Sequence, residues 1–228
     1  MVSNLRAYPV NELFQSIQGE GYFTGVPAIF IRLQGCPVAC PWCDTRHTWV
    51  VDPNHEVAAG QVENRSNQSA SWASMTSADL LLSISRLGYQ ARHIVLTGGE
   101  PCLYDLRELS RALLEQGFRV QIETSGTHEI LADNSCWVTV SPKVGMKGGY
   151  VVLDSALARA NEIKHPVAME KHIHELDQLL ARCERPDEKI ICLQPISQQP
   201  RATALAIEVC QARNWRLSVQ MHKYLRIE

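Results

Sequence analysis

Short β-rich runs that alternate with segments of helical periodicity constrain the fold of this chain more than any other feature. Each run ends in turn or polar residues, and the runs occupy residues 28–33, 93–99, 119–124, 137–142, 162–167, 189–195 and 216–221. Between most of them apolar residues recur at helical spacing, and Thr76 with Asp79 predicts the capping box of one helix. Strands that alternate with helices pair in parallel. We therefore expect an α/β fold, a partial (β/α) barrel of about six parallel strands with outer helices.

One segment interrupts this alternation. Residues 46–76 are rich in Ser, Asn and Gln and follow no sustained period. A stretch of this length without regular structure is uncommon in a compact domain and is often a lid or a mobile segment. We predict a single core domain over residues 1–228, with residues 46–76 as a segment inserted within it.

Charge and hydropathy exclude several classes of partner. The chain has 22 basic and 24 acidic residues, a net charge of -2, which gives no electrostatic argument for binding nucleic acid or an anionic membrane. No apolar run reaches the roughly 18 residues that cross a bilayer, and the first residues lack the apolar core of a secretory signal. We expect a cytoplasmic protein that acts on a small ligand.

Three of the eight cysteines lie in one short loop after the first predicted parallel strand. Cys36, Cys40 and Cys43 have the spacing CxxxCxxC, which lets three thiolates converge on one metal centre. Three thiolates hold three corners of a 4Fe-4S cluster and leave the fourth iron open. That iron can bind S-adenosylmethionine, and an electron passed into the sulfonium then yields a 5′-deoxyadenosyl radical that abstracts hydrogen. From the loop alone, a structural zinc with His47 as fourth ligand is the alternative.

Polar motifs end the next three predicted strands. They are Thr97-Gly98-Gly99-Glu100-Pro101, Glu123-Thr124-Ser125-Gly126 and Ser141-Pro142-Lys143. Because the carboxyl ends of parallel strands meet at one edge of a sheet, we expect these motifs to converge on the cysteine loop. The glycine pair permits close approach of a ligand, and the other groups suit a ribose, a carboxylate or an adenine edge.

Together these segments resemble the radical S-adenosylmethionine (radical SAM) superfamily and, within it, the 7-carboxy-7-deazaguanine synthase family. The resemblance runs almost from end to end and is strongest at residues 18–21, 29–36, 43–45, 97–101, 122–126, 140–143 and 222–224. It implies a carbon–nitrogen lyase of queuosine (7-deazapurine) biosynthesis, a tRNA modification pathway. Such a lyase converts 6-carboxy-5,6,7,8-tetrahydropterin to 7-carboxy-7-deazaguanine and ammonia by radical ring contraction, and it regenerates S-adenosylmethionine.

The resemblance also implies roles for individual residues. The cluster ligands are Cys36, Cys40 and Cys43, and Thr45 is the magnesium ligand. S-adenosylmethionine contacts Trp42, Cys43, Asp44, Gly99, Ser141, Pro142, Lys143, Gln194, Pro195, Ile196 and Ser197. The pterin contacts Ile17, Gln18, Gly19, Arg32 and Thr97, and Glu20 and His222 are further candidates for contact with its ring. Read without the resemblance, Arg32 is a strand-end ion pair, His222 a core histidine and Lys143 a solvated side chain.

The resemblance further implies a flavodoxin-type electron donor and a homodimer. From the charge balance we expect no direct contact with nucleic acid. Two other functions fit part of the sequence. A radical activase of a partner protein shares the cysteine loop and the Gly-Gly-Glu-Pro motif, but the matches at residues 18–21 and 43–45 argue against it. A zinc-stabilised binding module without catalysis is the second.

Overall fold

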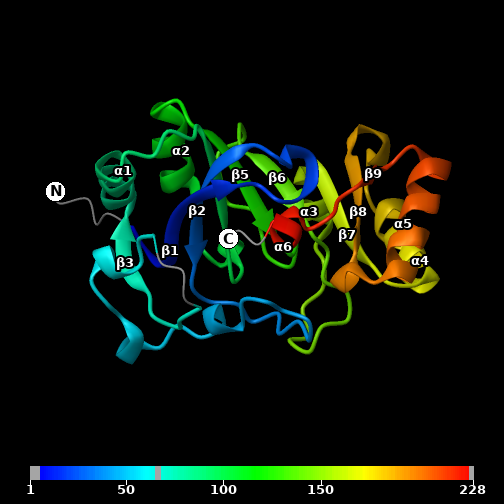
Figure 1. Cartoon of the computed structure of the whole chain (residues 1–228), viewed down its shortest axis with the longest axis horizontal. Helices are drawn as coiled ribbons and strands as arrows, with labels where there is room; N and C mark the ends of the chain where they lie inside the picture. Colours follow the sequence, from blue (N-terminus) through cyan, green and yellow to red (C-terminus); the bar gives the residue numbers. More distant parts are fainter. Residues whose placement is uncertain (1–5, 65–67, 226–228) are drawn as a thin grey trace.

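The computed structural model describes residues 6–64 and 68–225, and its strands form one nine-stranded sheet (Figure 1). The strand order is β3-β1-β2-β4-β5-β6-β7-β8-β9. The strands are β1 (Ala7–Ile17), β2 (Pro27–Leu33), β3 (Ala73–Thr76), β4 (His93–Gly98), β5 (Arg119–Thr124), β6 (Trp137–Val140), β7 (Glu162–Val167), β8 (Ile190–Pro195) and β9 (Arg216–Leu217). The helices are α1 (Ser77–Arg86), α2 (Arg107–Glu115), α3 (Asp154–Arg159), α4 (Glu170–Ala181), α5 (Pro200–Arg213) and α6 (Met221–Leu225).

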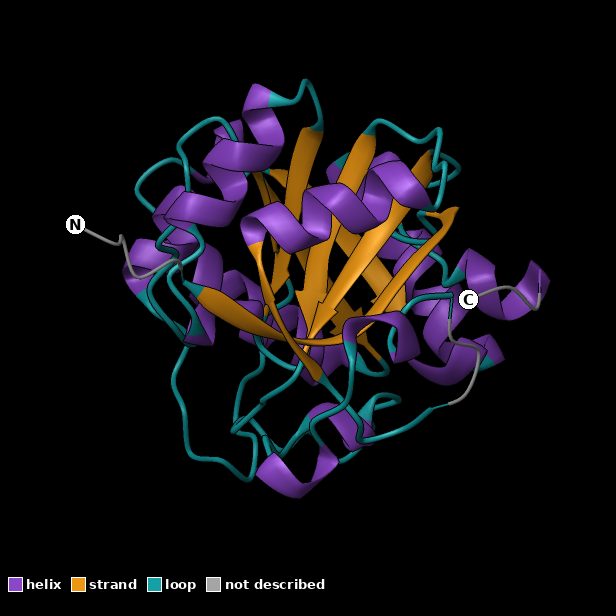
Figure 2. Cartoon of the chain, turned by 90° about the vertical axis from the view of Figure 1, so that its left-hand side faces the viewer, coloured by secondary structure: helices purple, strands orange, loops and turns teal. Residues whose placement is uncertain are grey.

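From β2 to β9 every neighbouring pair of strands is parallel. Helices α1 to α5 lie between these strands in sequence, and Figure 2 shows the helices packed around the strands. The sheet does not close, because β3 and β9 end the strand order without pairing to each other. The predicted partial barrel with outer helices is therefore confirmed. We expected about six parallel strands, and the structure has seven because the short strand β9 adds one at the edge.

Strand β1 is absent from the sequence-based description. It runs antiparallel to both β2 and β3. Its pairing with β2 shifts register between Val10 and Glu12, and the shift breaks the alternation of apolar and polar residues that marks a strand. Asn11 and Glu12 are both buried despite their polarity. The sequence of β1 therefore lacks the regular alternation of apolar and polar residues from which a strand is predicted.

The inserted segment is shorter and more ordered than predicted. Its last four residues form β3, an edge strand paired with β1, so the irregular part ends before Ala73. Short 3-10 turns punctuate the rest, and the amide of Leu13 in β1 donates to the carbonyl of Val62 over 2.8 Å. Residues 65–67 lie outside the described residues. The capping box of Thr76 and Asp79 is confirmed and opens α1 directly after β3.

The core consists of the apolar side chains between the strands and the outer helices. Leu80 and Ile84 of α1 and Leu109 and Leu113 of α2 are buried against residues such as Ile94 of β4. The carboxyl ends of the parallel strands are left uncovered by these helices. The cysteine loop runs along that edge of the sheet in Figure 1, which places the chemically active groups there.

Candidate active site

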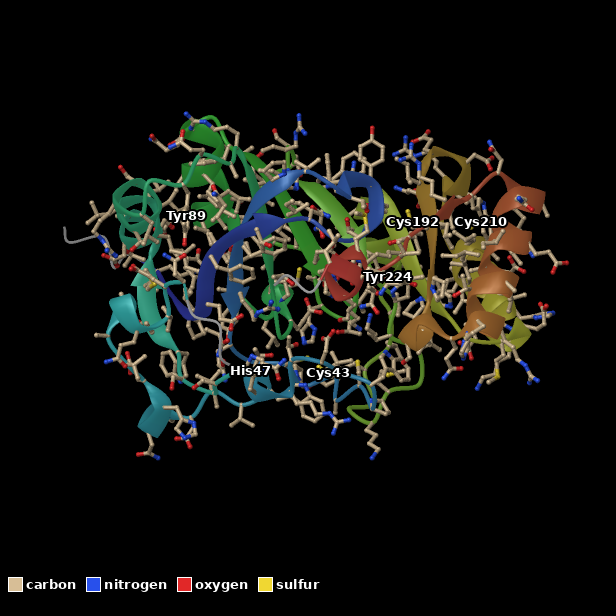
Figure 3. The ribbon with its side chains drawn as sticks, viewed as in Figure 1. Cys43, His47, Tyr89, Cys192, Cys210 and Tyr224 are labelled. Atoms are coloured by element: carbon tan, nitrogen blue, oxygen red, sulfur yellow. The ribbon has the colours of Figure 1, made fainter. Side chains whose placement is uncertain are left out.

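The cysteine loop follows β2 and is held by backbone hydrogen bonds. The amide of Gly35 donates to the carbonyl of Thr48 over 2.6 Å, and the amide of Cys36 donates to that of Trp49 over 2.9 Å. Within the loop, the Cys43 amide donates to the Cys40 carbonyl over 3.1 Å. The start of the inserted segment therefore fixes the shape of the loop. Figure 3 shows Cys43 and His47 on the chain segment that passes below the sheet.

The glycine pair after β4 serves the approach of this loop. A Cβ atom on Gly99 would lie 2.2 Å from the carbonyl oxygen of Gly35 and 2.9 Å from the Cβ of Cys36. A Cβ on Gly98 would lie 2.2 Å from the carbonyl oxygen of Leu33, and Gly98 has a φ of +142°. The sequence suggested room for a ligand at this position. The backbone of the cysteine loop occupies that room, although Gly99 also faces the cavity described below.

Glu100 joins the ends of β4 and β5. Its carboxylate is buried and accepts hydrogen bonds from the Thr124 hydroxyl at 2.6 Å and the Ser125 amide at 2.8 Å, and also from the Ser125 hydroxyl. The Glu100 amide donates to the Gly35 carbonyl over 2.8 Å. The Glu100 side chain thus links the motif at residues 97–101 to the motif at residues 123–126. The Glu100 backbone links both motifs to the cysteine loop.

The thiols of Cys36, Cys40 and Cys43 all face one cavity of about 260 Å³, called the cysteine cavity here. Among residues 6–64 and 68–225, no three His, Cys, Asp or Glu side chains are close enough to hold a single metal ion. His47 lines the second cavity described below and not this one, so the fourth ligand of the zinc alternative does not face the cavity of the three thiols. A cubane cluster takes each thiolate on a different iron, and three thiols on one cavity fit that donor set.

Burial raises the pKa of Cys36 to about 11 and also raises the pKa of Cys40. The nearby ammonium of Lys143 partly offsets this rise at Cys40. Lys143 itself is half-buried, and its ammonium donates to the Ser141 hydroxyl at 2.6 Å, so it is not the solvated side chain of the simpler interpretation. Desolvation lowers the pKa of Lys143. Metal binding would displace the thiol protons and place negative charge beside this cation.

The cysteine cavity collects most residues expected around S-adenosylmethionine. Those that line it are Trp42, Cys43, Asp44, Gly99, Ser141, Lys143, Gln194, Ile196 and Ser197. Pro142 and Pro195 are both buried and do not line the cavity. Trp42 lines the cavity and is 47% exposed, so this part of the lining is open to solvent. The motifs after β2, β4, β6 and β8 thus meet as predicted.

A second cavity of about 430 Å³, the arginine cavity, collects every residue expected around the pterin. These residues are Ile17, Gln18, Gly19, Glu20, Arg32, Thr97 and His222. The two cavities share a wall that includes Thr45, Thr97 and Gly98. A ligand in one cavity would therefore lie directly beside a ligand in the other.

Arg32 forms an ion pair and faces the cavity at the same time. Its Nε donates to Oε2 of Glu12 in β1 over 2.6 Å. Its guanidinium also lies 5.8 Å from the centre of the Phe14 ring, which stacks on Phe30. The strand-end ion pair of the simpler interpretation is thus present. It uses the Nε edge of the fork and fixes the orientation of the guanidinium in the cavity wall.

His222 reaches the cavity from α6. Its Nδ1 would lie 2.8 Å from a Cβ atom on Gly19, so the glycine makes room for the imidazole. Burial lowers the pKa of His222, although the carboxylate of Glu20 opposes that shift. The imidazole is only partly buried and lines the arginine cavity rather than the core.

Three side chains in or beside the shared wall escaped the sequence-based prediction as site residues or were recognised only in part: Lys164 and Glu123 line both cavities, and Gln121 is buried next to Glu123. Lys164 of β7 donates to Glu20 Oε2 over 2.7 Å and to Glu123 Oε2 over 2.9 Å. Gln121 of β5 donates to Glu123 Oε1 over 3.0 Å, and its own Oε1 accepts from Gln18 over 3.2 Å. Glu123 was named within a strand-end motif, whereas Lys164 and Gln121 lie inside strands. A lysine inside a predicted parallel strand was the available signal.

This hydrogen-bond network shifts the pKa values of Glu20 and Glu123 in opposite directions. Burial raises the pKa of Glu123 to about 7, an effect that Lys164 opposes and that nearby Glu162 and Glu20 increase. Burial acts on Glu20 in the same sense, but the ion pair with Lys164 outweighs it and lowers the pKa to about 2. Near neutral pH Glu20 is therefore a charged acceptor, while Glu123 can exchange a proton.

Known proteins share both this fold and this sequence. The family model of the Radical SAM superfamily matches residues 30–146 of this chain. The 7-carboxy-7-deazaguanine synthase of Escherichia coli (strain K12) is 58% identical over 220 residues, which are 96% of this chain and 99% of that protein. The chain belongs to the 7-carboxy-7-deazaguanine synthase family of radical SAM enzymes.

Two further members of the family support this placement. The enzyme of Buchnera aphidicola subsp. Schizaphis graminum (strain Sg) is 44% identical over 96% of this chain and 99% of its own length. The crystal structure of QueE from Escherichia coli superposes with a TM-score of 0.93 at 57% identity, and the match covers 95% of each chain. Membership in the superfamily carries with it a 4Fe-4S cluster and S-adenosylmethionine, which the donor set of the cysteine cavity fits.

Proposed function

We propose that this chain converts 6-carboxy-5,6,7,8-tetrahydropterin to 7-carboxy-7-deazaguanine and ammonia, as a radical lyase of queuosine biosynthesis. One observation carries the proposal: the cysteine cavity and the arginine cavity share a wall. A radical formed in the first would meet a substrate held in the second without crossing solvent. The names of the closely similar relatives point to the same product.

The cluster and S-adenosylmethionine would supply a 5′-deoxyadenosyl radical, and the protein's own residues would orient both ligands. Cys36, Cys40 and Cys43 would hold the cluster. The ammonium of Lys143, fixed by Ser141, would balance the carboxylate of the adenosyl cofactor. The other cofactor contacts expected from the family stay in this proposal, including Pro142 and Pro195, which would act through the backbone of their segments.

The arginine cavity has groups that complement a carboxylated pterin. The outer edge of the Arg32 guanidinium would pair with the substrate carboxylate, since Glu12 already occupies Nε. Glu20 would accept hydrogen bonds from the donor groups of the pyrimidine ring, and Gln18 would read its amide edge. Gln18 and Glu20 are preorganised, because the Glu20 amide donates to the Gln18 side-chain oxygen over 3.1 Å.

Thr45 would hold the magnesium ion. Its side chain lines both cavities, and a threonine oxygen is a hard ligand that suits Mg²⁺. A cation at this position would neutralise the substrate carboxylate together with Arg32. Thr45 also lies beside the cluster ligand Cys43, at 3.6 Å between Oγ1 and Sγ.

The proposal includes a flavodoxin-type electron donor, a homodimer and a cytoplasmic location. Electron delivery to a cluster under an exposed Trp42 needs a partner that reaches the open side of the cysteine cavity. Among the described helices, none combines the length and apolar character needed to cross a bilayer. The whole chain, residues 1–228, would act as one core domain.

The test is anaerobic reconstitution with iron and sulfide, followed by reduction and incubation with S-adenosylmethionine and the tetrahydropterin. Mass spectrometry should find 7-carboxy-7-deazaguanine with the wild-type protein and none with Cys40→Ala. Cys210→Ala, a buried cysteine on α5 far from Cys43 (Figure 3), is the matched control and should keep both cluster and product. Cluster assembly without product would overturn the assignment of the substrate. Full activity in Cys40→Ala would overturn the radical mechanism.

A further inference from the structure

The sulfur of Cys43 accepts a hydrogen bond from Trp49, a residue to which the motifs assign no role. The indole Nε1–H of Trp49 donates to Sγ of Cys43 over 3.3 Å. The hydroxyl of Thr45 lies 3.6 Å from the same sulfur, so two polar side chains face this cluster ligand. The indole contact is the shorter one, and its donor has a fixed direction because the ring is rigid.

Backbone and ring contacts hold Trp49 in place independently of this N–H. Its carbonyl accepts the amide of Cys36 over 2.9 Å, which shapes the cysteine loop. The guanidinium of Arg46 lies over the ring, with Cζ 5.9 Å from the ring centroid. The side chain is half-buried. A phenylalanine at position 49 would keep the backbone bond and most of the packing and would lose only the donor.

The donor matters because the cluster must take up an electron. One-electron reduction by a low-potential donor of the flavodoxin type adds one negative charge to the cluster and its thiolates, and it forms or breaks no bond. An N–H group that points at a ligand sulfur stabilises the more negative state and so raises the reduction potential. In a half-buried site this dipole is less screened than it would be in water.

We propose that Trp49 is a positioning residue that tunes the cluster, with its indole N–H held against the Cys43 thiolate to raise the reduction potential. It acts through Cys43 and lines neither the cysteine cavity nor the arginine cavity. The inference rests on the proposed function only through the cluster. Because the potential is measured without substrate, failure of the proposed lyase reaction would not be mistaken for failure of this inference.

The experiment is a potentiometric series on anaerobically reconstituted protein, followed by the EPR signal of the reduced cluster. Loss of a charged hydrogen bond in Trp49→Phe should shift the ratio of reduced to oxidised cluster about tenfold at a fixed potential. For a one-electron couple this is a fall of about 59 mV. Trp72→Phe is the matched control, because the Trp72 indole donates to the Asp52 carbonyl over 2.9 Å within the same inserted segment.

The expected result is a lower potential in Trp49→Phe and an unchanged potential in Trp72→Phe. Equal potentials in Trp49→Phe and wild type, with iron content equal, would overturn the proposal. If Trp49→Phe fails to load iron, wild-type protein containing indole-¹⁵N tryptophan provides the second test. Its reduced cluster should show a ¹⁵N coupling that persists in Trp42→Phe, and absence of that coupling would equally overturn the proposal.

Discussion

The cysteine cavity takes its walls mainly from loops that follow the strands, whereas the arginine cavity takes much of its wall from the strands and from distant segments. On the cysteine side, glycine-mediated backbone contact packs the motif after β4 against the cysteine loop. In the wall that the arginine cavity shares with the cysteine cavity, Lys164 bridges two carboxylates that lie 144 and 41 residues away in sequence. Close backbone packing therefore shapes the cysteine loop, and buried charge balance shapes the wall between the two sites.

Removing the ammonium of Lys164 should change the free energy of unfolding more than any other substitution considered for the two cavities. Lys164→Met leaves the buried carboxylates of Glu20 and Glu123 without their cation, which should lower the free energy of unfolding by about 3–5 kcal/mol. The measurement is denaturant unfolding of the anaerobically loaded protein. Arg182→Met, which removes an exposed pair with Asp154, is the control and should cost at most about 1 kcal/mol. Equal losses in the two variants would refute charge balance as the basis of the wall between the two sites.

The pH dependence of stability should carry the signature of Glu123. Its pKa is about 7 in the folded protein, compared with about 4.5 when unfolded, so the unfolded state loses the proton first. The stabilising contribution is therefore complete below pH 4.5 and is lost as pH rises through 7, by about 3 kcal/mol at most. Unfolding of wild type and Glu123→Gln at pH 5 and pH 8 checks this. A slope that persists in Glu123→Gln would assign it to another group.

Backbone packing on the cysteine side should respond to a single methyl group. Gly99→Ala would place a Cβ against the Gly35 carbonyl and should cost about 1–3 kcal/mol, together with a lower iron content after reconstitution. Gly60→Ala introduces its methyl group into open space and should change neither quantity. Unfolding curves and iron analysis measure both effects. Full iron loading in a stable Gly99→Ala protein would show that the close approach is unnecessary.

The smallest effect is expected at Thr45, another residue of the wall that the two cavities share. Thr45→Ala should keep the cluster, because the three thiolates are unchanged, and should weaken the response of turnover to magnesium. The activity of wild type and variant is compared over a series of Mg²⁺ concentrations, with the cluster spectrum as control. An identical magnesium response in both proteins would remove Thr45 from the metal site.

The same contrast explains which parts of the site are visible in the sequence. Residues of the cysteine cavity stand in contiguous motifs at predicted strand ends, so Cys36–Cys43 and residues 97–101 could be identified before the fold was known. Lys164 and Gln121 lie inside strands, where a polar residue is ordinarily taken as facing solvent. In the structure Lys164 lines both cavities and Gln121 donates to Glu123, because the face of each strand that is enclosed depends on how the strands pair across the sheet.

Secondary structure shows a similar limit. The seven parallel strands and the helix opened by Thr76 follow from local periodicity and capping, and they are confirmed. Strand β1 was missed because its register shift buries Asn11 and Glu12, and β3 was missed because its four residues lie beside a polar segment. Both strands depend on pairing across the sheet, which local propensity does not report.

The most direct test of adjacent cofactor and substrate sites follows a hydrogen atom between them. The loaded enzyme would be reduced anaerobically with S-adenosylmethionine and a tetrahydropterin that carries deuterium on its reduced ring, and both molecules would be analysed by mass spectrometry. Deuterium in S-adenosylmethionine or 5′-deoxyadenosine, together with 7-carboxy-7-deazaguanine, is the predicted result. Product formation with no deuterium in either adenosyl species would contradict direct transfer across the shared wall.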